Sequence, residues 1–161
     1  MLLDVSELAP AIYVRLDGTP RMPVLHRLLA LAIAAGAISV LLTAAGLTPD
    51  AQGVGTHTQL GMQPCQFLYR TGIPCAGCGM TTSFSNFAHG QVLASFVTHP
   101  FGFVLAIACA VAFWVGTYCA ITGKASYRLL RMIPMKAHLW FWLGIGLLGW
   151  VWKIVAVVSS H

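Results

Sequence analysis

Three cysteines lie close together in the chain: Cys65, and the Cys75 and Cys78 pair of a CxxC motif. Thiolates attack disulfides and bind soft metal ions, so this spacing allows redox or metal chemistry. A helix starting directly after the motif would bring free backbone N–H groups near the sulfurs and favour the thiolate form. Gly79 lets the backbone bend or approach another segment closely. This segment is the candidate site, with Gly79 and Thr81 as supporting positions.

Three interpretations of these cysteines stay open at the level of sequence. In the structural one, a bridge from Cys65 to Cys75 or Cys78 pins the loop and adds about 2–4 kcal/mol of stability. In the redox one, Cys75 and Cys78 form the reactive pair, and Cys65 resolves or relays the bridge. The surrounding sequence has no thioredoxin-like βαβ pattern, which counts against this interpretation. In the third, the sulfurs bind zinc, copper(I) or an iron–sulfur centre.

A closed zinc site needs a fourth ligand besides the three sulfurs. His57 and His99 can reach the cysteines through flexible backbone, so both are candidate metal ligands. His89 is badly placed, because eleven residues of continuous helix would put it about 16 Å beyond Cys78. Asp50 is the only carboxylate of the stretch, which argues against a Ser-His-Asp hydrolase. A metal ion is therefore compatible with the sequence, but no cofactor follows from it with certainty.

Composition indicates which elements must position the cysteines. The chain is 58% hydrophobic and 8% charged, whereas a soluble domain has about 25% charged residues. The apolar residues form three runs of about 20 residues, the length that crosses the hydrocarbon core as a helix. Lipid cannot satisfy backbone hydrogen bonds, so each run should be helical. The predicted fold class is an all-α integral membrane protein with three transmembrane helices.

The predicted organisation has six parts: a cytoplasmic arm at 1–27, transmembrane helices at 28–47, 101–121 and 139–158, a cysteine-bearing loop at 48–100, and a basic loop at 122–138. Basic residues concentrate in the arm and in the second loop. The positive-inside rule therefore places both in the cytoplasm and the cysteine loop on the outer side of the membrane, which for a bacterial protein would be the inner (plasma) membrane. A cleaved signal sequence over the first span is the alternative, although its lead of 27 residues is long for one.

The cysteine loop and the third span contain further patterned features. After Gly79, Met80 and Phe84 share one helical face and polar side chains share the opposite face, and a second short helix is expected at 91–97. These pieces are expected to be one or two short amphipathic helices at the membrane interface. Lys153 is the single charge of the third span, and it either snorkels to the interface or is a functional intramembrane charge.

A series of short motifs runs from the first loop cysteine to the second span: Cys65-Gln-Phe, Thr71-Gly-Ile-Pro-Cys75-x-x-Cys78-Gly79-Met-Thr81, His89-Gly and His99-Pro. The series resembles a bacterial family of small membrane proteins catalogued as a domain of unknown function, with the core Cys-Pro-x-Cys-Gly-x-Thr-Arg followed by a Gly and an Asn-Pro. Ala76, Thr82 and His99 replace the Pro, the Arg and the Asn of that pattern. The change to Thr82 counts against roles that need a cation beside the thiols. The resemblance implies a small helical membrane protein and supplies no activity.

The sequence therefore predicts a small membrane protein with an outward three-cysteine loop that is disulfide-stabilised or active in thiol exchange. The alternatives are a metal-binding membrane protein and a non-catalytic scaffold whose loop binds a partner protein. Lipid is the expected partner, and a membrane or extracytoplasmic protein, or self-association, is compatible with the pattern. Nucleic acid is not expected, since basic residues near the inner leaflet account for the net charge of +5.

Overall fold

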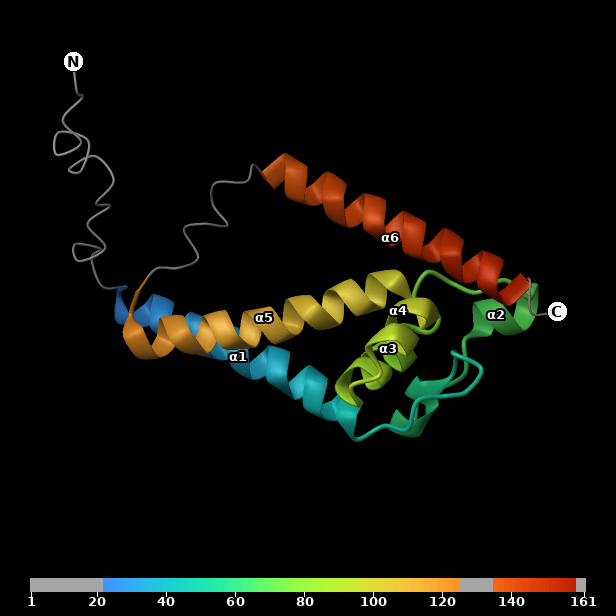
Figure 1. Ribbon diagram of the computed structural model, residues 1–161, viewed down its shortest axis with the longest axis horizontal. Coiled ribbons are helices and arrows are strands. Elements are labelled where there is room, and N and C mark those ends of the chain that lie inside the picture. The colour runs from blue at the N-terminus through green and yellow to red at the C-terminus, as the bar shows by residue number, and fades with distance from the viewer. Residues whose placement is uncertain (1–21, 125–134, 159–161) are drawn as a thin grey trace, which may run out of the picture.

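The structure, a computed structural model, describes residues 22–124 and 135–158 as helices joined by loops. Three helices are long and apolar enough to cross a membrane: α1 (Val24–Ala45), α5 (Pro100–Thr122) and α6 (Met135–Val158). Four short helices connect α1 to α5: η4 (Thr56–Leu60), α2 (Gln66–Thr71), α3 (Met80–Ala88) and α4 (Val92–Thr98) (Figure 1). The predicted all-α fold with three spans is confirmed. Most of the predicted arm at 1–27 and of the basic loop at 122–138 lies outside the described residues.

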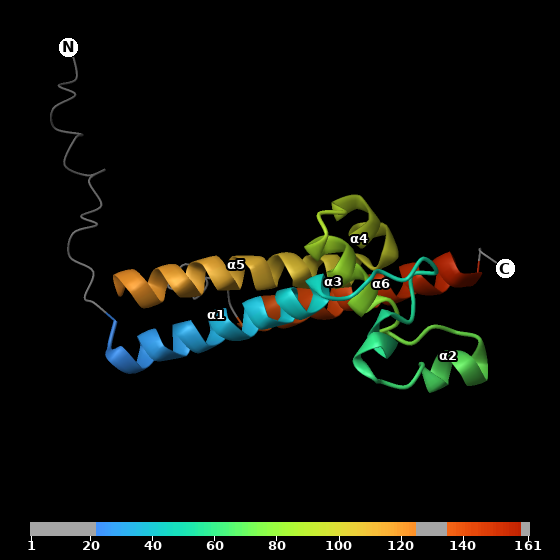
Figure 2. The ribbon, with the colours of Figure 1, turned by 90° about the horizontal axis from the view of Figure 1, so that it is seen from below.

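The helices α1 and α5 lie side by side and run in opposite directions (Figure 1, Figure 2). Their close approach depends on Gly116, where a Cβ atom would lie 2.8 Å from the carbonyl oxygen of Ala30 and 3.1 Å from the Cβ of Ala34. Small residues at such contacts let two helix backbones pack tightly in a membrane. The Arg27 Nε–H also donates a hydrogen bond to the carbonyl of Ala120 at 2.9 Å. The packed pair of α1 and α5 therefore fixes the two ends of the cysteine loop that connects them.

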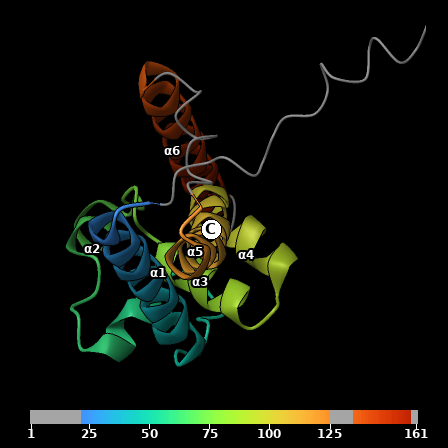
Figure 3. The same cartoon turned by 90° about the vertical axis from the view of Figure 1, so that its left-hand side faces the viewer.

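The third long helix, α6, stands apart from this pair in an end-on view (Figure 3) and is joined to the rest near its C-terminal end. There Gly149 packs on the start of α5, since a Cβ atom on it would lie 2.8 Å from the Cβ of Phe101. Three side chains of α6 donate hydrogen bonds to carbonyl oxygens of the loop: Trp150 to Pro74 (3.0 Å), Trp152 to Val97 (2.9 Å) and Lys153 to Gly53 (3.0 Å). The end of α6 is therefore part of the loop's packing.

The polar face of α3 is buried against its neighbours. Ser83 and Ser95 of α4 are fully buried and donate to each other's carbonyl oxygens at 2.9 and 2.7 Å. Ser85 donates to the carbonyl of Leu47 at 2.6 Å, just beyond the end of α1. Buried polar groups are stable only when they are hydrogen-bonded, and these pairs meet that condition. The polar stripe therefore serves interhelical packing and fixes the start of α3, directly after the CxxC motif.

Candidate functional site

The three loop cysteines meet in space, and their Sγ atoms all lie within 4.8 Å of one another. The Cys75 sulfur is central, at 3.5 Å from the Cys65 sulfur and 3.1 Å from the Cys78 sulfur. Cys65 is the N-cap residue of α2, while Cys75 and Cys78 lie in the connection between α2 and α3. Three cysteines at this spacing are close enough to hold a metal ion.

Local backbone geometry explains why the sulfurs converge. The Cys78 N–H donates to the carbonyl of Cys75 at 3.0 Å and closes a turn across the CxxC motif. Gly72 ends α2 and Gly79 precedes α3, both with positive φ, at 70° and 87°. Residues with a side chain rarely adopt this conformation, so the two glycines allow the chain to reverse on each side of the motif. The turn faces back toward the start of α2, where Cys65 lies.

All five cysteines are free thiols in this structure. The bridge from Cys65 that the structural interpretation requires is thus not formed here, although the three sulfurs are in contact. Cys109 and Cys119 belong to α5, and Cys119 is 2% exposed against α1 and its surroundings. Buried free cysteines in such a place behave as small apolar residues.

The loop thiols differ in their electrostatic environment. Hydrogen bonding by the backbone N–H of Leu68 is the main influence that lowers the pKa of Cys65 to about 7, and the neighbouring sulfurs contribute in the same direction. Burial raises the pKa of Cys78 to about 12. Cys65 is half-buried, whereas Cys78 is 6% exposed. The cluster therefore has a reactive thiolate at its open end and a protonated thiol at its closed end.

We expect the alkylation of Cys65 by iodoacetamide to speed up as the pH rises through about 7 and then to level off. The thiolate is the reacting form, so the rate follows its fraction. Peptide mass mapping after timed alkylation measures this rate, and the denatured protein is the control, with an inflection near the ordinary value of 9.0. An inflection near 9 in the folded protein would contradict the environment described for Cys65.

His99 is fully buried and holds the CxxC segment in place. The Gly102 N–H donates to its Nδ1 at 3.1 Å, so the ring proton is on Nε2, which donates to the carbonyl of Ala76 at 3.2 Å. Burial lowers its pKa and keeps the ring neutral. With both nitrogens hydrogen-bonded inside the protein, His99 is not available as a metal ligand in this arrangement and acts as a support for the motif.

His57 lies on the open side of the cluster. It shares a hollow of about 230 Å³ with Cys65 and Cys78, which Tyr69 also lines. Its Nε2 is 3.2 Å from the carbonyl oxygen of Gln63, an exposed contact. Of the two histidines predicted as metal ligands, His57 lines the same hollow as two of the cysteines, but the ligand atoms that lie within 4.8 Å of one another are the three sulfurs and do not include its ring.

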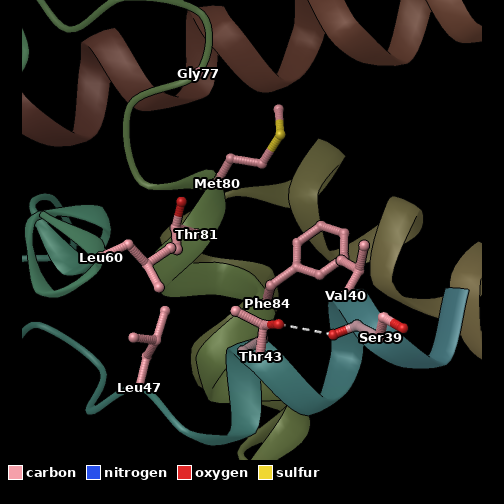
Figure 4. A pocket seen from close by; sticks show the side chains of 10 residues that line it. Ser39, Val40, Thr43, Leu47, Leu60, Gly77, Met80, Thr81 and Phe84 are labelled. Atoms are coloured by element: carbon pink, nitrogen blue, oxygen red, sulfur yellow. Dashed lines mark hydrogen bonds between the residues drawn. The ribbon is translucent and has the colours of Figure 1, made fainter. Parts of the chain in front are cut away.

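Thr81 lines an apolar hollow of about 500 Å³ between α3 and the end of α1. Figure 4 shows Thr81, Met80 and Phe84 of α3 opposite Thr43 and its neighbours on α1. Gly77, inside the CxxC motif, also lines this hollow. Of the two supporting positions of the motif, Gly79 shapes the thiol cluster and Thr81 belongs to the packing of α3 on α1.

Lys153 is the residue of this site that sequence reasoning left ambiguous. It is 4% exposed, and its Nζ donates to the carbonyl of Gly53 at 3.0 Å. A Cβ atom built on Gly79 would lie 2.9 Å from this Nζ, so the ammonium lies against the residue that follows Cys78. The snorkelling interpretation places the head group in water, whereas the structure buries it in protein beside the thiols. The only sequence signal for this position was a charge inside a span.

One comparison with known proteins bears on this segment. A family model described as "Protein of unknown function (DUF2752)" matches residues 65–113. The match confirms the resemblance to a family of unknown function, and it covers the three loop cysteines, the short helices α2 to α4 and more than half of α5. No curated protein and no solved structure matches the chain. The activity must therefore be argued from the site itself.

Proposed function

We propose that this chain is a membrane-bound thiol–disulfide exchange protein whose centre is Cys65, Cys75 and Cys78. The observation that carries the proposal is the row of three sulfurs, with Cys75 at 3.5 Å from Cys65 and 3.1 Å from Cys78. Either neighbour can exchange a bridge with Cys75 after a small movement. The difference in pKa along the row, about 7 at Cys65 and about 12 at Cys78, separates an entry thiol from an inner thiol.

The reaction begins at Cys65, because a thiol with a pKa near the working pH attacks disulfides most efficiently. Its thiolate attacks one sulfur of a substrate disulfide, a new S–S bond forms, and the other substrate sulfur leaves as a thiolate. Cys75 then attacks the Cys65 sulfur and releases the second substrate sulfur, while a Cys65–Cys75 bridge forms. The substrate disulfide gains two electrons and two protons, and the two cysteines lose them.

The third cysteine moves the bridge inward. Cys78 loses its thiol proton to water and attacks the Cys75 sulfur, a Cys75–Cys78 bond forms, and Cys65 leaves as a thiolate that is stable because of its low pKa. This step transfers no net electrons and frees the entry thiol again. A protein or small-molecule dithiol restores the starting state by the reverse steps. The substrates are therefore a disulfide and a dithiol that exchange through the site.

The charge pattern supports an extracytoplasmic position for this centre. Basic residues precede α1 and lie between α5 and α6, which favours the cytoplasm for those segments and the outer side for the cysteine loop. Disulfides form and persist outside the cytoplasm, in the bacterial case at the outer face of the inner membrane. The partner of the site is then an extracytoplasmic protein that presents a disulfide or a dithiol.

A second function, binding of a soft metal ion, is favoured by the mutual distance of all three sulfurs. Thiolates that share one zinc ion at about 2.3 Å lie about 3.8 Å apart in a tetrahedral site, and the sulfurs here lie within 4.8 Å of one another. His57, which lines the same hollow as Cys65 and Cys78, is the candidate for a fourth ligand. Such an ion would hold the loop closed or be carried by it.

One experiment separates the two functions. The full-length protein, purified in detergent without chelator, is equilibrated with glutathione buffers of graded potential, and free thiols are then alkylated and mapped by mass. Exchange predicts one two-electron transition with bridges among Cys65, Cys75 and Cys78, while Cys109 stays free at every potential. Three loop thiols that never form a bridge would contradict exchange. Stoichiometric metal in the same preparation, with the thiols exposed only by chelator, would support the second function.

A further inference from the structure

The closed end of the thiol row contains a basic side chain. This side chain is Lys153 of α6, which is distant from the cysteines in the sequence. A Cβ atom added to Gly79 would lie 2.9 Å from the Lys153 Nζ. The Gly53 carbonyl accepts one hydrogen bond from it at 3.0 Å. With 4% of its surface exposed, this ammonium is almost completely removed from solvent. A buried charge is costly unless it is paired, so its partner needs to be identified.

No carboxylate is placed to be that partner in the part of the chain that the structure describes. Asp50 is the single acidic residue there, and its carboxylate accepts a hydrogen bond from the Gln52 N–H at 2.9 Å. His99, the other titratable group that interacts with Lys153, is a neutral ring held by two hydrogen bonds. The remaining neighbour is Cys78, which interacts electrostatically with Lys153. The Cys78 thiol is protonated at rest, so the anion that would pair with Lys153 forms only while negative charge develops on the Cys78 sulfur during exchange.

We propose that Lys153 is a positioning residue for the inner step of exchange, in which its ammonium stabilises negative charge on the Cys78 sulfur. This inference rests on the proposed thiol exchange. When the bridge moves between Cys65–Cys75 and Cys75–Cys78, one S–S bond forms and one breaks. The electron pair leaves on the Cys65 sulfur in one direction and on the Cys78 sulfur in the other. A cation beside Cys78 speeds both directions, because the same charge develops in the shared transition state.

The expected effect is on the rate of bridge migration and not on the entry reaction. An opposite charge within about 4–6 Å shifts a thiol pKa by about 1–3 units. Because nucleophilicity falls as the pKa falls, the net change in rate is about tenfold. Cys65 lies at the open end of the row, so its reaction with a small disulfide should stay unchanged. A general loss of structure would slow both the entry reaction and the bridge migration, so slowing of the migration alone is specific to the proposed role.

The test uses the full-length protein in detergent, with oxidised glutathione as the probe. Acid quenching and mass mapping follow first the mixed disulfide on Cys65 and then the bridge that contains Cys78. Lys153→Gln, which keeps a donor for the Gly53 carbonyl but loses the charge, should slow the second step about tenfold. Lys153→Arg should remain within about threefold of the wild type, because it keeps the charge. Trp152→Phe, which removes the neighbouring hydrogen bond from α6 to Val97, is the matched control. Its rate of bridge migration should equal that of the wild type.

The outcomes distinguish the inference from the proposed function. A wild-type protein in which Cys65 does not react with oxidised glutathione overturns the exchange function. Normal entry with equal migration rates in the wild type and in Lys153→Gln overturns the role of Lys153, as does equal slowing in Trp152→Phe. If the Lys153 variants do not fold, a measurement on the wild-type protein still tests the inference. The chain has three lysines, so their isotope-labelled Nζ signals can be resolved by NMR. A Lys153 signal that does not change when Cys78 forms a bridge also overturns the inference.

Discussion

The Cys75→Ser variant is expected to lose turnover of disulfide exchange by about 100-fold or more, since it removes the fast intramolecular step. Cys75 is the sulfur that touches both others, at 3.5 Å and 3.1 Å. Without it, the Cys65 thiolate still attacks a substrate disulfide, but no adjacent sulfur resolves the product. The mixed disulfide on Cys65 should therefore accumulate. Stopped reactions with oxidised glutathione, read by intact mass, measure both the lost turnover and the trapped adduct.

The other cysteine variants give this prediction its specificity. Cys65→Ser should fail at entry and trap no adduct, because the low-pKa thiolate is gone. Cys78→Ser should still form the Cys65–Cys75 bridge and stop there. Cys109→Ser, a cysteine of α5 outside the cluster, is the control and should behave as the wild type. Equal loss in all four variants would point to general damage, and full turnover in Cys75→Ser would contradict the central role of that sulfur.

The spans and the thiol motif were predictable from the sequence because both are local signals. An apolar run of about 20 residues has few alternatives to a membrane helix. The spacing of Cys75, Cys78 and Gly79 indicates a turn before a helix without any knowledge of the fold. The short helices η4 and α2 left no such signal, since five or six residues are too few to show a period. For η4 the structure supplies a tertiary contact instead, the Thr56–Thr82 hydroxyl pair at 2.8 Å.

The electrostatics of the site could not be predicted, because they depend on a residue distant in sequence. The change to Thr82 suggested a thiol site without a cation, and Thr82 is indeed buried in packing, 1% exposed. The cation that the structure brings to Cys78 comes from α6, at Lys153. A single lysine in a span is equally compatible with snorkelling until the loop that covers it is known. Similarly, only the structure distinguishes His57, which shares a hollow with two of the cysteines, from His99, which supports the motif.

Gly79→Ala is expected to destabilise the loop by about 2–6 kcal/mol, the largest effect on stability of any small substitution in the motif. One contribution is the backbone, since a φ of 87° costs a residue with a side chain about 1–3 kcal/mol. A second is steric, of about the same size. The added Cβ atom would lie 2.6 Å from the carbonyl oxygen of Gly53 and 2.9 Å from the Nζ of Lys153. Backbone cannot move away cheaply, so Cys78 or the end of α6 must shift.

Two neighbouring glycines separate these contributions. Gly72→Ala has a φ of 70° and no atom within 4 Å of the added Cβ, so it should show the backbone strain alone. Gly77→Ala has neither a positive φ nor a close contact and should be nearly neutral, although it lies inside the CxxC motif. Thermal unfolding in detergent ranks the three variants, and alkylation of Cys78 reports whether the cluster has opened. Equal losses in Gly72→Ala and Gly79→Ala would show that the contact with Gly53 and Lys153 contributes nothing. A larger loss in Gly79→Ala, with Cys78 newly reactive, would show that this contact keeps the inner thiol buried beside its cation.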